Sequence, residues 1–249
     1  MANWSDPRQT AAPFGTSAAD TRSAAYDAGL RSYMLSVYNY MASGVLLTGI
    51  VAMLFASGGV NSLAAQVFMA PGILKYIVIF SPLAFVLVLN FGLNRLSTGA
   101  AQLIFWAFAA VMGVSMSTIF LVYTGTSIAI TFFATAVAFL SLSLYGYSTK
   151  RDLSGFGTFL IMGVVGIIVA SLLNLWFKSP AMAMVISAVG VLLFAGLTAY
   201  DTQRIKGMYA YVAGTDMMGK AVIMGALSLY LDFINMFQFL LQFMGSNRN

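Results

Sequence analysis

Asp232 is an acidic residue in the middle of an apolar stretch, Leu229-Tyr230-Leu231-Asp232-Phe233-Ile234. An Asp at the centre of a membrane-spanning helix costs about 2.5–3.5 kcal/mol on insertion scales, so such a residue is interpreted first as functional. The nearest basic residues in the sequence are Lys220 and Arg248, and neither lies close enough to be a local partner. We therefore expect Asp232 to take part in proton or cation chemistry.

Two more ionisable residues lie at the ends of apolar stretches. Asp201 occurs in Ala199-Tyr200-Asp201-Thr202-Gln203-Arg204, where pairing with Arg204 at i+3 of a helix is an alternative, purely structural explanation. Arg95 ends the stretch Asn90-Phe91-Gly92-Leu93-Asn94-Arg95. It is either a positively charged loop anchor or a functional group.

Asp201 and Asp232 would act together if their helices brought them close. Two carboxylates in a medium of low dielectric constant do not both ionise easily, so the pair would share a proton. A nearby Arg95 would favour the ionised pair and hold it as a latch. The same oxygens suit transient contact with Ca²⁺, which prefers carboxylate, carbonyl and water ligands. We therefore expect a pH-sensing, ion-contacting pair with an arginine latch.

The depth of the two acids in the membrane is a difficulty for this hypothesis. A last helix that begins at Lys220 places Asp232 about 18 Å along its axis, at 1.5 Å per residue. Asp201 lies at the end of its apolar segment and is expected nearer the surface. Contact between the two requires a tilted helix, a re-entrant loop within 206–219, or a later start of the last helix.

The rest of the sequence excludes a soluble protein. Of its 249 residues 60% are hydrophobic and 8% are charged, and the mean hydropathy is +0.89, whereas a soluble domain has about 25% charged residues. Four runs contain no Asp, Glu, Lys or Arg: 32–74, 96–149, 153–177 and 179–200. Since about 20 apolar residues span a bilayer as a helix, the sequence predicts a polytopic helical membrane protein.

The residue types that are missing limit the chemistry further. The sequence has no Cys and no His, which removes thiolate nucleophiles, imidazole bases and the usual zinc, haem and copper ligands. We expect no cofactor, with Ca²⁺ as a permeant ion only. The net charge of +5 comes from basic residues spread thinly over short loops, so we expect the lipid bilayer and no nucleic acid as a partner.

Seven apolar segments predict an all-α integral membrane protein with a seven-helix transmembrane bundle. The segments are 33–57, 73–93, 99–122, 127–147, 156–178, 181–204 and 220–244, separated by short turns rich in Gly, Ser and Pro. Their continuous apolar character is unlike the alternating strands of a membrane barrel. Seven glycines are expected to allow close helix approach: Gly44, Gly49, Gly113, Gly163, Gly166, Gly190 and Gly196.

The sequence divides into an arm and a membrane domain. Residues 1–31 are rich in Ala, Ser and Thr with mixed charges, and we expect a flexible or loosely helical cytoplasmic arm, with a surface helix over 26–38 as a second option. The arm lacks the apolar stretch of a signal peptide. Residues 32–249 form the predicted seven-helix domain.

The basic residues predict the orientation. With the N-terminus in the cytoplasm, nine basic residues fall on the cytoplasmic side: Arg8, Arg22, Arg31, Arg95, Lys150, Arg151, Arg204, Lys206 and Lys220. Three fall on the other side: Lys75, Lys178 and Arg248. This asymmetry predicts a cytoplasmic N-terminus and an external C-terminus, and the short loops favour a bacterial inner membrane over an organelle.

Two stretches carry a resemblance to a known family. Residues 195–203, Ala-Gly-Leu-Thr-Ala-Tyr-Asp-Thr-Gln, and residues 226–235, Ala-Leu-Ser-Leu-Tyr-Leu-Asp-Phe-Ile-Asn, resemble the Bax inhibitor-1 family, and Ser81-Pro82-Leu83 fits as well. The resemblance implies a seven-helix bundle with the last helix in the centre. It implies a pH-sensitive calcium leak channel in which Asp201 and Asp232 match the aspartate pair and Arg95 is the candidate latch.

Two other functions remain open. A non-transporting regulatory protein would bind a membrane protease or a stress-response partner, with the N-terminal arm as its handle. An intramembrane aspartyl protease also uses two aspartates, but its second one lies in Gly-x-Gly-Asp and a Pro-Ala-Leu follows it. Here the matching residues are Leu229-Tyr230-Leu231-Asp232, and no Pro follows Pro180. We therefore expect no enzymatic activity.

Overall fold

The computed structural model describes residues 18–93 and 95–248, and this part of the chain is helical without a β-strand. Its helices are α1 (Ala18–Phe55), the short 3₁₀ helix η1 (Gly59–Asn61), α2 (Leu63–Met69), α3 (Leu74–Gly92), α4 (Thr98–Met116), α5 (Thr118–Val122), α6 (Gly125–Ser148), α7 (Ser154–Phe177), α8 (Pro180–Val212) and α9 (Met218–Met244). The predicted all-α fold is confirmed.

Within the residues that the structure describes, seven helical stretches are long and apolar enough to cross a membrane. They are α1 from Arg22, α3, α4 continued by α5, α6, α7, α8 and α9. Each overlaps one of the seven predicted segments over most of its length, so the predicted seven-helix bundle is confirmed. The chain is an integral membrane protein.

The first helix begins earlier than the apolar segment that predicts it. α1 starts at Ala18, so residues 18–31 of the predicted arm are helical, while residues 1–17 lie outside the described residues. The helix continues because Leu30, Tyr33, Met34 and Val37 are buried at spacings of three and four residues, which places them on one face. Hydropathy alone marks where this helix enters the membrane, not where it begins.

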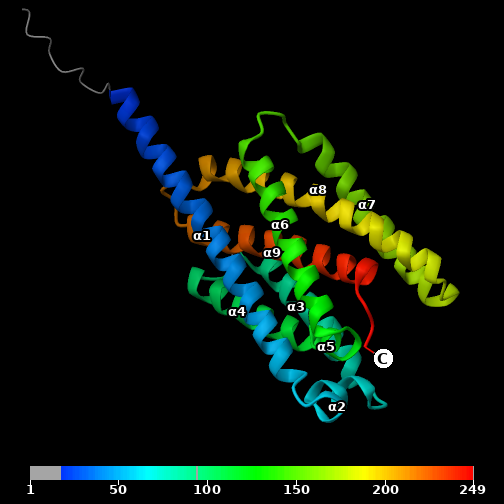
Figure 1. The fold of residues 1–249 in the computed structure, drawn as a ribbon. Coiled ribbons are helices and arrows are strands. Elements are labelled where there is room, and N and C mark those ends of the chain that lie inside the picture. The colour runs from blue at the N-terminus through cyan, green and yellow to red at the C-terminus, as the bar shows by residue number, and fades with distance from the viewer. Residues whose placement is uncertain (1–17, 94, 249) are drawn as a thin grey trace, which may run out of the picture.

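The last helix lies in the centre of the bundle, with α1, α6 and α8 beside it (Figure 1). α9 packs against α8, α1, α6 and α4, and 67% of its most apolar stretch is buried, against 11–33% in the other six spans. A helix buried on most sides has to satisfy or neutralise any polar group that it carries. Asp232 is on this helix.

Close helix approach at glycine is confirmed for five of the seven predicted positions. A methyl group at Gly44, Gly113, Gly163, Gly190 or Gly196 would collide with a neighbouring helix, whereas Gly49 and Gly166 have open space beside them. The prediction is therefore wrong for Gly49 and Gly166. Gly146 and Gly157 were not predicted, although they face the backbone of Ala199 and the ring of Tyr200, because sequence does not show which side of a helix meets a neighbour.

Candidate functional site

Asp201 and Asp232 line one cavity between α8 and α9. Their residues are 8% and 4% exposed, and both contribute to a cavity of about 590 Å³ whose other walls come from α3, α4 and α7. We call it the acid cavity. The wall is mostly aliphatic, and its polar residues are the two acids, Ser228 and Asn235.

The length of α8 brings the two acids to comparable depth. α8 runs to Val212, beyond the predicted end at 204, and a five-residue turn leads to α9. At 1.5 Å per residue, about 16 Å of helix separate Asp201 from the end of α8, and about 21 Å separate Asp232 from the start of α9 at Met218. Residues 206–212 are thus helical instead of re-entrant, and α9 starts earlier than predicted, not later.

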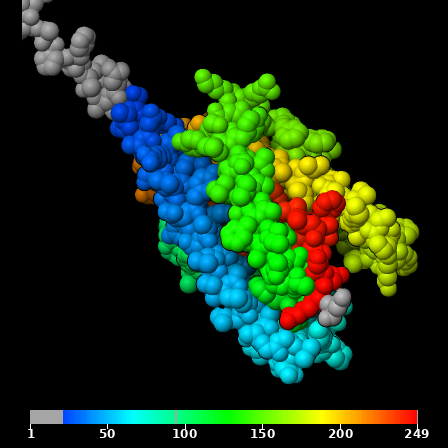
Figure 2. All heavy atoms as spheres, in the orientation of Figure 1, coloured from blue at the N-terminus to red at the C-terminus, as the bar shows by residue number. Residues whose placement is uncertain are grey.

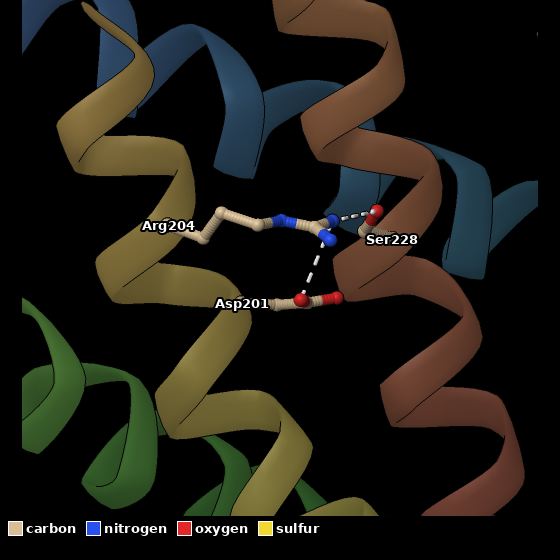
Figure 3. Close-up of polar contacts among 3 residues, drawn as sticks. All are labelled: Asp201, Arg204 and Ser228. Carbon is tan, nitrogen blue, oxygen red and sulfur yellow. Dashed lines mark hydrogen bonds and ion pairs between the residues drawn. The ribbon is translucent and has the colours of Figure 1, made fainter. Parts of the chain in front are cut away.

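Arg204 connects Asp201 to the neighbouring helix (Figure 3). Its Nη2 atom lies 3.3 Å from Oδ1 of Asp201 and donates a hydrogen bond of 3.3 Å to Oγ of Ser228 on α9. The Asp201 side chain is 11% exposed and that of Arg204 is 44% exposed, so the ion pair lies at one edge of the buried region. The local Asp201–Arg204 pair that the sequence allowed is confirmed, and it also links α8 to α9.

Asp232 lies one helical turn beyond Ser228 on α9. Its Oδ2 atom is buried and has no hydrogen-bond partner within the described part of the chain. A buried carboxylate oxygen without a donor is costly as an anion, and either a proton or a cation relieves that cost.

Arg95 lies away from the pair in this conformation. It is exposed, between α3 and α4, and makes no ion pair with any described residue. The arginine that pairs with Asp201 is Arg204. The latch role of Arg95 therefore stays a prediction.

The neighbours of Asp201 in the sequence hold α8 in position. The hydroxyl of Thr202 shares a hydrogen bond of 3.0 Å with Ser143 of α6. The amide of Gln203 accepts from the backbone N–H of Leu153 at 2.9 Å and donates to the carbonyl of Arg151 at 2.8 Å, which fixes the turn before α7. Residues 201–203 thus reach three different parts of the bundle, and this fixes the orientation of Asp201.

A polar stripe along α9 was missed by the sequence analysis. Its members are Ser228, Asp232, Asn235, Gln238 and Gln242, spaced by four, three, three and four residues. This spacing places them on one face of a helix, and all five line the acid cavity or the cavity next to it. The signal was present in the sequence as helical periodicity of uncharged polar residues.

No cluster of three or more Asp, Glu, His or Cys side chains exists in the part of the chain that the structure describes. The acid cavity offers two carboxylates, the Asn235 amide and the Ser228 hydroxyl as oxygen ligands. Calcium sites that bind tightly use six to eight oxygens. The arrangement suits brief contact with a cation better than storage.

A bundle of seven apolar helices whose central helix is buried and carries an acid defines a polytopic membrane protein with an ionisable site in its core. A family model described as "Inhibitor of apoptosis-promoting Bax1" matches residues 30–249. The chain belongs to this family, the Bax inhibitor-1 family. The family resemblance drawn from the two Asp stretches is confirmed.

Several bacterial proteins are similar over nearly the whole chain. A protein of Rickettsia prowazekii is 47% identical over 225 residues, which cover 90% of this chain and 93% of that protein. A protein of Caulobacter vibrioides is 45% identical, with 92% and 94% covered. The inner membrane protein YbhL of Escherichia coli K12 is 44% identical, with 89% and 94% covered.

Proposed function

We propose that this protein is a pH-sensitive leak channel for cations, Ca²⁺ in particular, in a bacterial inner membrane. Asp201 and Asp232 are the pH-sensing, ion-contacting pair. The observation that carries the proposal is that two buried acids from different helices line the same cavity, where one of them holds the cross-helix arginine. Ionisable residues inside a membrane protein are typical of ion pathways and proton relays.

A second cavity supplies a route from the pair toward the C-terminal end of α9. It has a volume of about 380 Å³ and shares Ile79 and Met112 with the acid cavity. Its polar lining residues are Ser115, Thr118, Tyr123, Gln238 and Gln242. Together with Asn235 these oxygens provide partners for a partly hydrated cation over about 21 Å of α9, the rise from residue 228 to residue 242.

The link formed by Arg204 is the proposed barrier at the other end of this route. Protonation of Asp201 removes the charge that pairs with Arg204, so the contact between α8 and α9 through Ser228 is weakened. The helices around α9 then shift to a second packing. Arg95 stays the candidate latch of the ionised pair, and protonation of the acids releases that latch as well. A change of charge at one pair, coupled to two alternative packings, is a common form of switch.

The proposed channel has a defined orientation in the membrane and no enzymatic activity. The N-terminus is in the cytoplasm and the C-terminus outside, so the Arg204 end of the route faces the cytoplasm. The protein carries no resident cofactor and catalyses no reaction, and Ca²⁺ is its permeant ion.

Calcium flux into liposomes tests this function. Purified protein in vesicles that contain a calcium dye should admit Ca²⁺ with a rate that depends on pH. Asp232→Asn should abolish the pH dependence, while Asp216→Asn, an exposed acid in the turn between α8 and α9, should leave it unchanged. Equal rates and equal pH responses in the protein and in D232N would disprove the proposal, provided that both variants elute as folded protein.

A further inference from the structure

A groove runs along the seam between α1 and α6. Both helices pack against α9 and lie next to each other on the face seen in Figure 2, with few close approaches between their own backbones. Between them the hydroxyl of Tyr38 on α1 donates a hydrogen bond of 3.0 Å to Oγ of Ser143 on α6. Three adjoining cavities of about 380, 390 and 290 Å³ follow the seam. We call them together the seam groove.

The three cavities adjoin one another along the seam. Tyr38 and Leu140 line both the first and the second cavity, and Val45, Phe132 and Phe233 line both the second and the third. Because neighbouring cavities share walls, a single flexible chain can lie across them.

The seam groove is open to the lipid. Leu35, Leu46, Leu140 and Leu144 line it, and they are 53%, 65%, 63% and 67% exposed. On a membrane-spanning helix such side chains face hydrocarbon. The occupant of this part of the groove must therefore be apolar.

One end of the seam groove is polar and basic. Arg31 and Tyr147 line it there, and Nζ of Lys206 lies 4.6 Å from the centre of the Tyr147 ring. Arg31 is exposed and makes no ion pair with a described residue, including Asp27 one turn before it. Its guanidinium is therefore available to an anionic group, for which Arg is well suited.

The first two cavities of the groove together match one lipid leaflet in length. From Arg31 to Leu46 the α1 helix rises about 22 Å. Half of a bilayer, headgroups included, is about 20–22 Å thick. An anion at Arg31 and an apolar tail that reaches Leu46 thus have the dimensions of a phospholipid.

We propose that the seam groove is a binding site for an anionic phospholipid. Its phosphate binds Arg31, and one acyl chain lies along the groove between α1 and α6. The floor of the groove includes Phe233, the residue next to Asp232 on α9. The bound chain therefore packs against the helix that carries the buried acid, whatever that acid does.

Native mass spectrometry of the full-length protein tests the site. Delipidated protein is titrated with phosphatidylglycerol or with phosphatidylcholine of the same acyl chains. The loss of one basic contact weakens the binding of an anionic lipid about fivefold. Arg31→Gln should therefore lower phosphatidylglycerol retention about fivefold, to the level of phosphatidylcholine retention. Arg22→Gln, an exposed arginine on the same helix, should have no effect.

A second test of the site fills the seam groove with a larger side chain. Ala42 lines the groove, and Ala134 is exposed on α6 outside it. Ala42→Phe should abolish retention of both lipids, and Ala134→Phe should preserve it. Equal retention in A42F and A134F, or in R31Q and R22Q, would show ordinary boundary lipid only and would overturn the proposal.

Fluorescence quenching tests the acyl chain without filling the groove. The protein has no Cys, so Leu140→Cys and Val137→Cys each give a single labelling site. Leu140 lies inside the groove and Val137 outside it, and their exposure is similar, 63% and 67%. A dye at position 140 should be quenched by a small fraction of brominated phosphatidylglycerol, whereas a dye at 137 should need much more. Identical quenching curves would contradict the site.

Discussion

At the residue scale, Arg204 is the side chain through which Asp201 reaches α9. Its Nη2 atom contacts the Asp201 carboxylate and donates to the Ser228 hydroxyl at once, so a single guanidinium nitrogen links α8 to α9. On the proposed function this contact restrains the leak when Asp201 is ionised.

Removal of this contact should raise the leak at neutral pH. Arg204→Gln removes the charge partner of Asp201, so we expect the Ca²⁺ leak at neutral pH to rise about fivefold or more. Fivefold is about the low end of typical coupling between two sites. Acid should then raise the leak of this variant little further. Flux into liposomes measures it. Arg151→Gln, an exposed arginine in the turn before α7, is the control, and an unchanged neutral leak in R204Q would contradict the barrier role.

Asp152 offers a separate test outside the membrane-spanning helices. Hydrogen bonds from the side chain and the backbone N–H of Ser154 lower the pKa of the Asp152 carboxyl below its ordinary value of 3.8. A carboxyl whose pKa is lowered by folding stabilises the fold at pH values above its ordinary pKa. This stabilisation is lost as the pH falls through the lowered pKa. Asp152→Asn should therefore lower the Tm at neutral pH and approach the parent protein in strong acid. A Tm difference that does not change with pH would refute this.

Residue type and position were enough to select Asp201 and Asp232, because an acid in an apolar span stands out. The polar stripe was not recognised, because Asn235, Gln238 and Gln242 are ordinary polar residues one by one. The contact between Arg204 and Ser228 could not be predicted at all, since it depends on which faces of α8 and α9 meet.

At the element scale, α8 extends beyond the membrane-spanning segment that predicts it. Arg204 and Lys206 lower the hydropathy, but Ile205 and Tyr209 are buried against the bundle and keep the helix going to Val212. The length of apolar sequence reports membrane thickness, and the length of the helix is set by packing. This difference moved Asp201 away from the end of its helix and resolved the depth problem.

The close approach of α6 to α8 requires a glycine at the contact, and this requirement can be tested. A methyl group at Gly146 would collide with the carbonyl oxygen of Ala199, whereas Gly166 on α7 has open space beside it. Gly146→Ala should destabilise the fold by about 1–3 kcal/mol through overpacking. Gly166→Ala should be neutral or stabilising by up to about 1 kcal/mol because Gly is a poor helix former. Thermal unfolding in detergent compares them, and equal Tm values would contradict the packing of α6 on α8.

At the scale of the whole molecule, the seven-helix fold followed from composition and segment length, since a bilayer admits few other structures. The central place of the last helix was expected from family resemblance, and the structure confirms it through the burial of α9. Which helices leave a groove between them, as α1 and α6 do, has no counterpart in hydropathy.

The orientation of the whole molecule is a prediction that single cysteines can test. Since the chain has no Cys, Lys150→Cys and Ser246→Cys each give one exposed site, at opposite ends of the bundle by the predicted topology. A maleimide that cannot cross the inner membrane should label Ser246→Cys in cells whose outer membrane has been made permeable. It should label Lys150→Cys only after lysis. The reverse pattern would invert the orientation.

The central claim is that Asp201 and Asp232 work as one unit in one cavity. The most direct measurement is a double-mutant cycle on Ca²⁺ flux at neutral and acidic pH, with D201N, D232N and the double variant in liposomes. Residues that act as a unit are strongly non-additive, so either single change should remove the pH response and the double change should remove no more. If each single variant keeps part of the pH response and the two losses multiply in the double variant, the acids act independently and the claim is wrong.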